Sequence, residues 1–395
     1  MRVEFGALTV TDRARKLING AIDSNRLSSG KYVRELEEQF ADFVGTKEAV
    51  AVSSGTDALT LSLAALDAME IDICRGCGVV VPALSFAATG NAIMHAGFQP
   101  VFVDVNINTL SMNIEEARKI ICKGVPVVLP VHLMGKPVDM DELSTLSATI
   151  VEDAAEAHGA KYKNKNIGTF GLMAAFSLYV AHIISSIEGG MITTNNPEAA
   201  RILRSLRNHG RLCDCKVCVL NTNPKECPRR FKKGFDGRFV FDKIGYSCKM
   251  NELEAAVGLG TMEIAEEILE KRKENFYYFS KEFERFEDYF YTIKEESHEL
   301  IGPHAFSLIL KEGLKFKRED LTSYLIENGI DNRTLFSSIP TQNEGFKHFG
   351  YQLGEFPVAE YIGENGLHFG IHQDIGKKER KYIMKTFERF IRKHK

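Results

Sequence analysis

The sequence has little net charge and no long hydrophobic segment. Its 395 residues include 50 lysine and arginine residues against 53 aspartate and glutamate residues, which gives a net charge of −3. A nearly neutral chain has no electrostatic attraction for nucleic acid or for an anionic membrane surface. The first residues contain no basic segment followed by an apolar run, and no stretch approaches the roughly 18 apolar residues of a membrane span. We therefore predict a soluble, cytoplasmic protein that binds neither nucleic acid nor membranes.

Internal repeats and low-complexity linkers are also absent. Hydrophobic residues make up 44% of the chain, which is enough for a large core and suggests two or three domains. Over the first two thirds, short apolar runs alternate with helical patterns, which predicts an α/β fold with a mainly parallel sheet covered on both faces. The predicted strands are residues 49–52, 78–82, 101–104, 127–130 and 149–153, and the predicted helices are residues 57–67, 89–96 and 114–122.

The last third has a different pattern. Residues 251–286 are rich in Glu, Leu, Ala and Lys, which predicts one long helical region. Beyond it, the sequence predicts a strand at residues 304–310 and helices at residues 318–328 and 377–392. We therefore predict a large domain of residues 1–261 and a smaller C-terminal α+β domain of residues 262–395.

Two segments of the large domain place polar groups at the ends of predicted strands. Residues 53–57 read Ser-Ser-Gly-Thr-Asp and begin a helix, where small residues let backbone N–H groups hold an anion. Asp153 ends another strand, and a carboxylate there could hold a protonated ring nitrogen and keep that ring electron-poor. Either segment could instead be an ordinary helix cap. Phe86 could stack on a ring and Ser177 could bind a phosphate, although core packing and an ordinary strand serine are the simpler explanations.

The order and separation of these four features resemble a known family across nearly the whole chain. The matching segments are Ser-Gly-Thr-Asp-Ala-Leu at residues 54–59, Pro-Ala-Leu-Ser-Phe at 82–86, Val-Glu-Asp-Ala-Ala-Glu-Ala-His-Gly-Ala at 151–160, Phe-Ser-Leu-Tyr at 176–179, and further pieces at 29–37, 207–210 and 245–258. They resemble the DegT/DnrJ/EryC1/StrS family of sugar aminotransferases. That resemblance implies a type I (aspartate aminotransferase-like) fold that binds pyridoxal phosphate (PLP), a homodimer with sites at the subunit interface, and nucleotide-linked 4-keto-6-deoxy sugars as substrates.

The resemblance also implies roles for the residues that would bind the phosphate of the cofactor. Gly55, Thr56 and Asp57 should cradle it, and Ser177 should contribute a hydroxyl. The family often has asparagine where Ser247 stands, reaching the phosphate of the partner subunit, so this chain departs from the pattern there.

Three other residues should contact the pyridine ring. Phe86 should stack on it, Asp153 should pair with its nitrogen, and Glu156 should lie near its hydroxyl. The family usually has glutamine at the position of Glu156. Arg333 could approach the nucleotide, although a surface arginine is the simpler interpretation.

The lysine on which this family depends is missing. His182 stands five residues after Ser177, where the family's lysine forms an imine with PLP, and an imidazole cannot form that bond. The replacement resembles the branch of sugar 3-dehydrases, which bind the cofactor untethered as pyridoxamine phosphate (PMP). There the histidine removes a proton and the C3 hydroxyl of the sugar departs, a role that suits a group titrating near neutral pH. An engineered replacement and an inactive homologue are the alternatives.

Eight cysteines in a chain without a signal segment favour metal or redox chemistry over a disulfide framework. Cys213, Cys215, Cys218 and Cys227 lie within fifteen residues, inside a cysteine-rich insertion that spans residues 211–240. Four such thiols could hold zinc or an iron–sulfur cluster, and their spacing alone does not decide between the two.

The resemblance favours iron and sulfide. One dehydrase branch, acting on a CDP-linked 4-keto-6-deoxyhexose, carries a [2Fe-2S] cluster on a similar array, with a slightly shorter gap before the fourth cysteine. The cluster would pass single electrons from a flavin/iron–sulfur reductase, which the 3-deoxy product requires. Rival interpretations are a glutamate-coupled dehydratase or aminotransferase variant with structural zinc, and a non-catalytic sugar-nucleotide sensor or scaffold.

The four remaining cysteines are not predicted to bind a metal. Cys74 and Cys77 form a second C-x-x-C pair with a structural or incidental role, whereas Cys122 and Cys248 are predicted to be packing residues.

Overall fold

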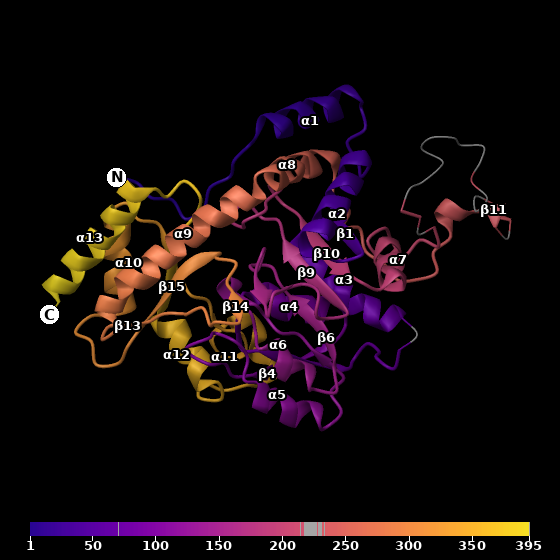
Figure 1. The fold of residues 1–395 in the computed structure, drawn as a ribbon. Coiled ribbons are helices and arrows are strands. Elements are labelled where there is room, and N and C mark those ends of the chain that lie inside the picture. Colours follow the sequence, from indigo (N-terminus) through magenta and orange to yellow (C-terminus); the bar gives the residue numbers. More distant parts are fainter. Residues whose placement is uncertain (70, 214, 217–226, 228–230, 233, 395) are drawn as a thin grey trace.

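The computed structural model describes residues 1–395 except residues 70, 214, 217–226, 228–230, 233 and 395. Figure 1 shows two regions, a central sheet with its surrounding helices and a C-terminal part that also holds the start of the chain. Both ends of the chain lie on the side of the molecule formed by the C-terminal part.

The central sheet has seven strands in the order β1-β10-β9-β6-β5-β2-β4. Strand β10 is antiparallel to both of its neighbours, whereas β9, β6, β5, β2 and β4 are parallel. The strands are β1 (Glu48–Val52), β2 (Gly78–Pro82), β4 (Gln99–Val103), β5 (Val127–Val128), β6 (Thr149–Asp153), β9 (Met173–Ser177) and β10 (Gly190–Thr194). The mainly parallel α/β fold is thus confirmed, although the sequence prediction missed β9 and β10.

Helices cover both faces of this sheet. Side chains alternate along a strand, and Val79 and Val81 belong to one buried hydrophobic cluster whereas Val80 belongs to another. The helices of this region are α1 (Asp12–Asp23), α2 (Lys31–Val44), α3 (Gly55–Ala68), α4 (Ala87–His95), α5 (Ile114–Ile121), α6 (Met140–Ser144), α7 (Pro197–Leu206) and α8 (Glu252–Glu263). Its short strands are β3 (Leu84–Ser85), β7 (Lys161–Tyr162), β8 (Lys165–Asn166), β11 (Phe231–Lys232) and β12 (Phe235–Asp236).

The C-terminal part is built on a four-stranded antiparallel sheet in the order β13-β15-β18-β16. Its core is aromatic, with ring centroids of Phe283 and Phe306 5.3 Å apart and those of Phe279 and Phe369 5.1 Å apart. Its elements are α9 (Ala265–Phe283), β13 (Phe290–Tyr291), β14 (Glu299–Leu300), β15 (Ala305–Leu310), α10 (Arg318–Glu327), β16 (Asn332–Thr334), β17 (Ser337–Ser338), α11 (Ile339–Gln342), α12 (Pro357–Asn365), β18 (Gly366–Gly370) and α13 (Lys377–Lys393).

The single long helix predicted at residues 251–286 is interrupted. Helices α8 and α9 meet at Ile264, whose φ of −115° and ψ of 13° lie outside the helical region. The break lets α8 pack on α1 and α2 while α9 continues into the C-terminal part, as Figure 1 shows. The domain boundary at residue 262 stays a prediction.

Two buried carboxylates tie together segments that are far apart in the sequence. Glu252 accepts hydrogen bonds from the backbone N–H groups of Gly30, Tyr32 and Val33 at the start of α2. Glu37 pairs with Arg207 at 2.6 Å. These side chains come from the segments at 29–37, 207–210 and 245–258, so part of the family pattern serves to hold the fold together.

Candidate active site

The first turn of α3 lies beside the end of β9 and could hold an anion. Ser54 caps this helix by accepting a hydrogen bond from the N–H of Asp57, which leaves the N–H groups of Gly55 and Thr56 without partners inside the helix. A Cβ atom on Gly55 would lie 2.7 Å from that of Ser177, so only glycine lets the end of β9 approach this closely. Two backbone donors and the Ser177 hydroxyl therefore lie together at a helix N-terminus, where an anion is stabilised.

Asp57 contributes differently from its neighbours. Its carboxylate accepts hydrogen bonds from the hydroxyls of Ser53, at 2.6 Å, and Ser54, at 2.9 Å. Because its N–H is also engaged, the geometry favours Gly55, Thr56 and Ser177 over Asp57 as direct ligands of an anion. A contact between Asp57 and phosphate stays a prediction.

Asp153 is a buried carboxylate at the C-terminal end of β6. Thr89 donates its hydroxyl to Oδ2 at 2.8 Å, and the N–H of Ala155 donates to Oδ1 at 3.2 Å. Only 4% of Asp153 is exposed, and this burial raises the pKa of its carboxyl despite both hydrogen bonds. A protonated ring nitrogen in this position would supply the missing positive charge. Sequence reasoning missed Thr89, because only the fold brings α4 over the end of β6.

Glu156 lies three residues after Asp153 and contacts the backbone of Met134. Its Oε2 accepts the N–H of Met134 at 2.7 Å, and Met134 has a φ of 56°, which a non-glycine residue adopts at a cost. Its Oε1 is 3.6 Å from Nε2 of His304, a second residue that sequence reasoning missed. Burial raises the pKa of Glu156 to about 8, with the charge of Asp153 adding to the effect and the Met134 N–H opposing it.

His182 follows β9 in the turn that leads to β10. Its ring lies 4.8 Å from that of His304 and 6.1 Å from that of His158, measured between centroids. Its Nδ1 is buried and has no hydrogen-bond partner among the described residues, so Nε2 is the ring nitrogen left to meet a ligand. Burial, helped by the charge of Arg272, lowers the pKa of His182 to about 3. The imidazole is therefore neutral at physiological pH, with a nitrogen free to accept a proton. The titration near neutral pH expected from the sequence is not found, because burial disfavours the charged ring.

Phe86 is not a core residue, since 61% of it is exposed at the start of α4. Its ring lies 5.8 Å from that of Phe336, which the pairing of β17 with β3 brings close. An exposed aromatic ring beside the turn that carries the site is available to stack on a bound ring.

The cysteine-rich insertion is only partly described. Cys213 and Cys215 have sulfur atoms 3.9 Å apart, and Cys227 is half-buried, whereas Cys218 lies outside the described residues. Two thiolates on one tetrahedral metal ion are about 3.8 Å apart, so the first pair fits such an arrangement. Within the described ranges, no three potential ligands come together, and the metal site stays a prediction.

The other cysteines differ in burial. Cys74 and Cys77 have sulfur atoms 3.5 Å apart in an exposed loop, and Cys248 is buried as predicted. The packing role expected for Cys122 is wrong, because this residue caps α5 on the solvent side.

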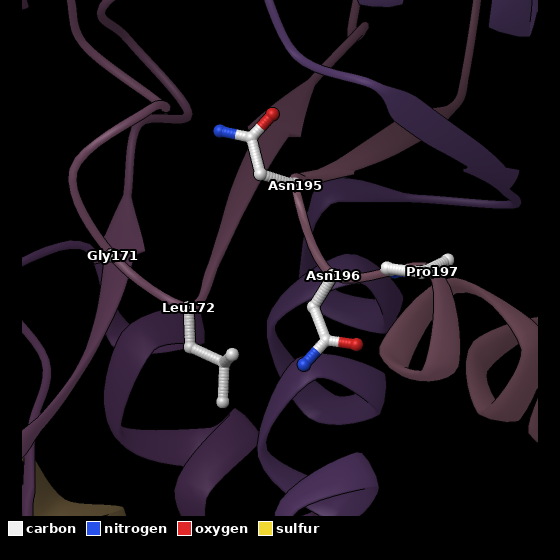
Figure 2. Close-up of a pocket in the computed structure, with 5 residues that line it drawn as sticks. All are labelled: Gly171, Leu172, Asn195, Asn196 and Pro197. Carbon is white, nitrogen blue, oxygen red and sulfur yellow. The ribbon is translucent and has the colours of Figure 1, made fainter.

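A hollow elsewhere on the surface, drawn in Figure 2, is lined by Gly171, Leu172, Asn195, Asn196 and Pro197. It lies at the opposite end of the strands from His182, because β10 runs antiparallel to β9 and ends beside residue 173. Asn196 is already engaged in capping α7, so the hollow offers no catalytic group.

None of the described helices has the length and apolar character that crossing a bilayer requires.

The fold and the site define the class of the protein. A mainly parallel seven-stranded sheet, with an anion site, a buried aspartate and an exposed aromatic ring at its edge, is the architecture of the PLP-dependent aminotransferase fold. The chain belongs to the DegT/DnrJ/EryC1/StrS aminotransferase family, whose pattern it matches over residues 9–388.

Similar proteins of this family include sugar dehydratases. GDP-4-keto-6-deoxy-D-mannose 3-dehydratase of Escherichia coli O55:H7 is 32% identical over 372 residues, which cover 92% of this chain and 94% of that protein. A structure of the E. coli enzyme with bound hydrated PLP superposes with a TM-score of 0.85 at 29% identity, covering 98% of this chain and 99% of that one. A structure of GDP-4-keto-6-deoxymannose-3-dehydratase with a trapped PLP-glutamate geminal diamine gives a TM-score of 0.83 at 28% identity, covering 98% and 100%.

Proposed function

We propose that this enzyme removes the C3 hydroxyl of a nucleotide-linked 4-keto-6-deoxy sugar, with PMP as cofactor and His182 as the base. The observation that carries the proposal is the neutral, half-buried imidazole of His182 where the family has its cofactor lysine. The resemblance to 3-dehydratases at about a third of all positions supports the same reaction class.

The residues of the site fit this cofactor. Gly55, Thr56 and Ser177 offer donors for its phosphate, Asp153 lacks a positive partner that a protonated ring nitrogen would supply, and Phe86 exposes a ring. When bound, PMP supplies an amine for the C4 ketone and a ring that withdraws electrons from the reacting carbon.

The protein's own part in the reaction is the movement of protons. Nε2 of His182 takes the proton that leaves carbon, and the same nitrogen returns it to the departing C3 oxygen, which leaves as water. The low pKa of His182 keeps this nitrogen free beforehand.

A direct test uses purified enzyme, PMP and 4-keto-6-deoxyhexoses linked to CDP, dTDP and GDP, with loss of water followed by mass spectrometry. His182→Asn keeps a polar side chain but removes the base, and it should lower the rate of water loss by about 10²- to 10⁴-fold. His182→Lys should restore the covalent bond to PLP, seen as a shifted absorption band, and turn the enzyme toward transamination or inactivity. Full dehydration by either variant contradicts the role given to His182. A protein that binds no PMP and turns over no 4-keto sugar would instead be a sensor or scaffold.

The source of electrons is a second part of the proposal. We propose that Cys213, Cys215, Cys218 and Cys227 hold a [2Fe-2S] cluster that accepts electrons from a flavin/iron–sulfur reductase. The support is the cysteine spacing and the 3.9 Å between the first two sulfur atoms. The glutamate adduct seen with the dehydratase relative favours the rival, a glutamate-coupled reaction with structural zinc.

Iron, acid-labile sulfide and zinc measured in anaerobically purified protein decide between the two. Iron and sulfide in equal amounts would support the cluster. Zinc, or no metal, together with water loss that depends on added glutamate, would support the rival.

We also propose that the enzyme is a homodimer. The insertion and its flank expose four large apolar side chains, Leu212, Phe239, Phe241 and Ile244, of which Ile244 is 77% exposed. Backbone pairing between Leu212 and Val240 keeps them in one region. Such a group is typical of a protein interface. Sedimentation should give twice the chain mass, and Ile244→Asp should lower the dimer fraction.

A further inference from the structure

Glu156, His304 and His182 form a row of titratable side chains that come from three separate parts of the chain. Glu156 follows β6, His182 follows β9, and His304 precedes β15 in the C-terminal part. The rings of His182 and His304 are neighbours at 4.8 Å, and Nε2 of His304 is 3.6 Å from Oε1 of Glu156. Only 6% of His304 is exposed, so the row runs from the base into the interior.

Within the part of the chain that the structure describes, both histidines of this row have a ring nitrogen without a partner. Nδ1 of His182 and Nδ1 of His304 are both buried, and neither has a hydrogen-bond partner among the described residues. Oε2 of Glu156 is engaged by the Met134 N–H, which leaves Oε1 for His304. Buried ring nitrogens are rarely left unpaired, and catalytic hydrogen bonds in ligand-free sites are often longer than in the working complex. Ring centroids 4.8 Å apart leave the two imidazoles close enough for a hydrogen bond between them in the working complex.

We propose that His304 is a positioning residue that relays a proton between His182 and Glu156. The inference rests on the proposed function, in which His182 is the base. It also gives a reason for glutamate where the family usually has glutamine, because a carboxylate can take up a proton and an amide cannot.

The relay balances as follows. His182 begins with its proton on Nδ1 and His304 with its proton on Nε2. The relay uses the ionised form of Glu156, which its pKa of about 8 makes the minor form at neutral pH and the major form above pH 8. When Nε2 of His182 takes a proton, its Nδ1 proton passes to Nδ1 of His304, and the Nε2 proton of His304 passes to Oε1 of ionised Glu156. Glu156 becomes neutral, and both rings stay neutral. The reverse sequence delivers the proton back through His182.

The other titratable or charged groups around the row do not offer the same path. The ring of His158 is 6.1 Å from that of His182 and packs against Phe40 and Phe176, and it has no ion pair with a described carboxylate. Arg272 donates to the carbonyl oxygen of His304 at 2.8 Å and cannot accept a proton. Asp153 faces Glu156 and is committed to Thr89. His368 acts on His304 only from a distance and contacts Phe5 and Phe336.

The test is a pH titration of the ring nitrogens by NMR, on cofactor-free protein labelled with 15N-histidine. The His182 resonances are assigned from their loss in His182→Gln. We expect Glu156→Gln, which keeps the shape of the side chain, and His304→Gln each to change the His182 nitrogen shifts and their pH dependence. The double variant should change them no further than His304→Gln alone, since the path is already cut.

His368→Gln is the matched control. His368 is buried and packs on Phe5, as His304 does. Among the described residues its Nδ1 has no hydrogen-bond partner, and it forms no ion pair with a carboxylate. The His182 shifts should be unchanged in this variant. The proposal is overturned if Glu156→Gln leaves the His182 titration as in the unmodified protein, or if His368→Gln alters it as much as His304→Gln does. Because no sugar is present, failure of the dehydration assay would not affect this result.

Discussion

The site around His182 and the cysteine-rich insertion differ in how their residues are brought together. The site takes Gly55, Asp153, Ser177 and His304 from positions up to 249 residues apart, and each stands at or next to one end of a strand or helix. The insertion takes its cysteines from one short stretch of sequence, and only Cys213 and Cys215 are close to each other among its described thiols.

One site is thus arranged by the fold itself, whereas the other would need its ligand to bring its residues together. The rigid sheet positions the groups around His182 without a ligand, so their burial and unmatched charge already exist in the protein alone. Clustered thiols repel one another once ionised, and a metal ion bound there would set their geometry. We therefore expect the first site to respond to substitutions in its affinity and catalysis, and the second in its metal content.

The largest effect should come from His182→Asn. Loss of a general base lowers kcat by about 10²- to 10⁴-fold. The iron content of the purified protein should not change, because the insertion does not depend on this residue. Steady-state kinetics and metal analysis of the same sample check both statements. A parallel fall in iron would mean that the two regions are not independent.

Cys213→Ser should lower the metal content and leave cofactor binding unchanged. Iron and sulfide should fall to near zero, and reductase-dependent formation of the 3-deoxy product should fall with them, because serine is a poor ligand for a soft metal. The affinity for PMP, measured by fluorescence titration, should stay the same. Cys122→Ser, on the solvent side of α5, is the control and should leave the iron content intact.

Asp153→Asn should weaken cofactor binding and stabilise the empty protein. Removing one partner of a buried charge pair costs about 2–5 kcal/mol, so the Kd for PMP should rise at least tenfold. Without cofactor, the substitution should raise the stability of the folded protein. The folded-state pKa of Asp153 is raised above that of the unfolded chain, so the ionised carboxylate destabilises the fold as pH rises, and asparagine removes this effect. Thermal unfolding at neutral pH with and without PMP measures both. If Asp153→Asn shifts Tm equally with and without PMP, Asp153 does not pair with the ring nitrogen of the cofactor.

The sequence predicted local features better than distant ones. Strand β2 has the predicted bounds because it is a short, buried run of valines flanked by turns. Strand β6 also has the predicted bounds, with Ile150 and Val151 ahead of two polar residues. Strands β9 and β10 were missed although the fold buries most of both, because the two alanines of β9 and the glycine that begins β10 have a low strand propensity. Tertiary packing, which local pattern does not contain, decides such cases.

In the candidate site, too, local sequence pattern identified some residues and missed those that only the fold brings in. The segments that carry Gly55, Asp153 and His182 were found from local pattern and resemblance. His304 was assigned to a predicted strand and Arg272 to a predicted helix, and neither position indicated a role. Only the structure places Arg272, with 1% of its surface exposed, beside the histidines. A basic residue within a helical pattern normally indicates a solvent-facing position.

The smallest expected effect is a dependence of stability on pH that comes from Glu156. Its folded-state pKa of about 8 is above the value near 4.3 of an unfolded glutamate, so the folded state holds its proton more tightly. The stability from this proton is fully present below about pH 4 and is lost as pH rises toward 8. The cofactor-free protein should therefore lose a few degrees of Tm over this range, and Glu156→Gln should lose less, because an amide does not titrate. Substituting the exposed Glu364 by glutamine should leave the slope as it is. If Glu156→Gln has the same slope as the unmodified protein, the burial of this carboxyl does not control its proton, and the relay through His304 loses its acceptor.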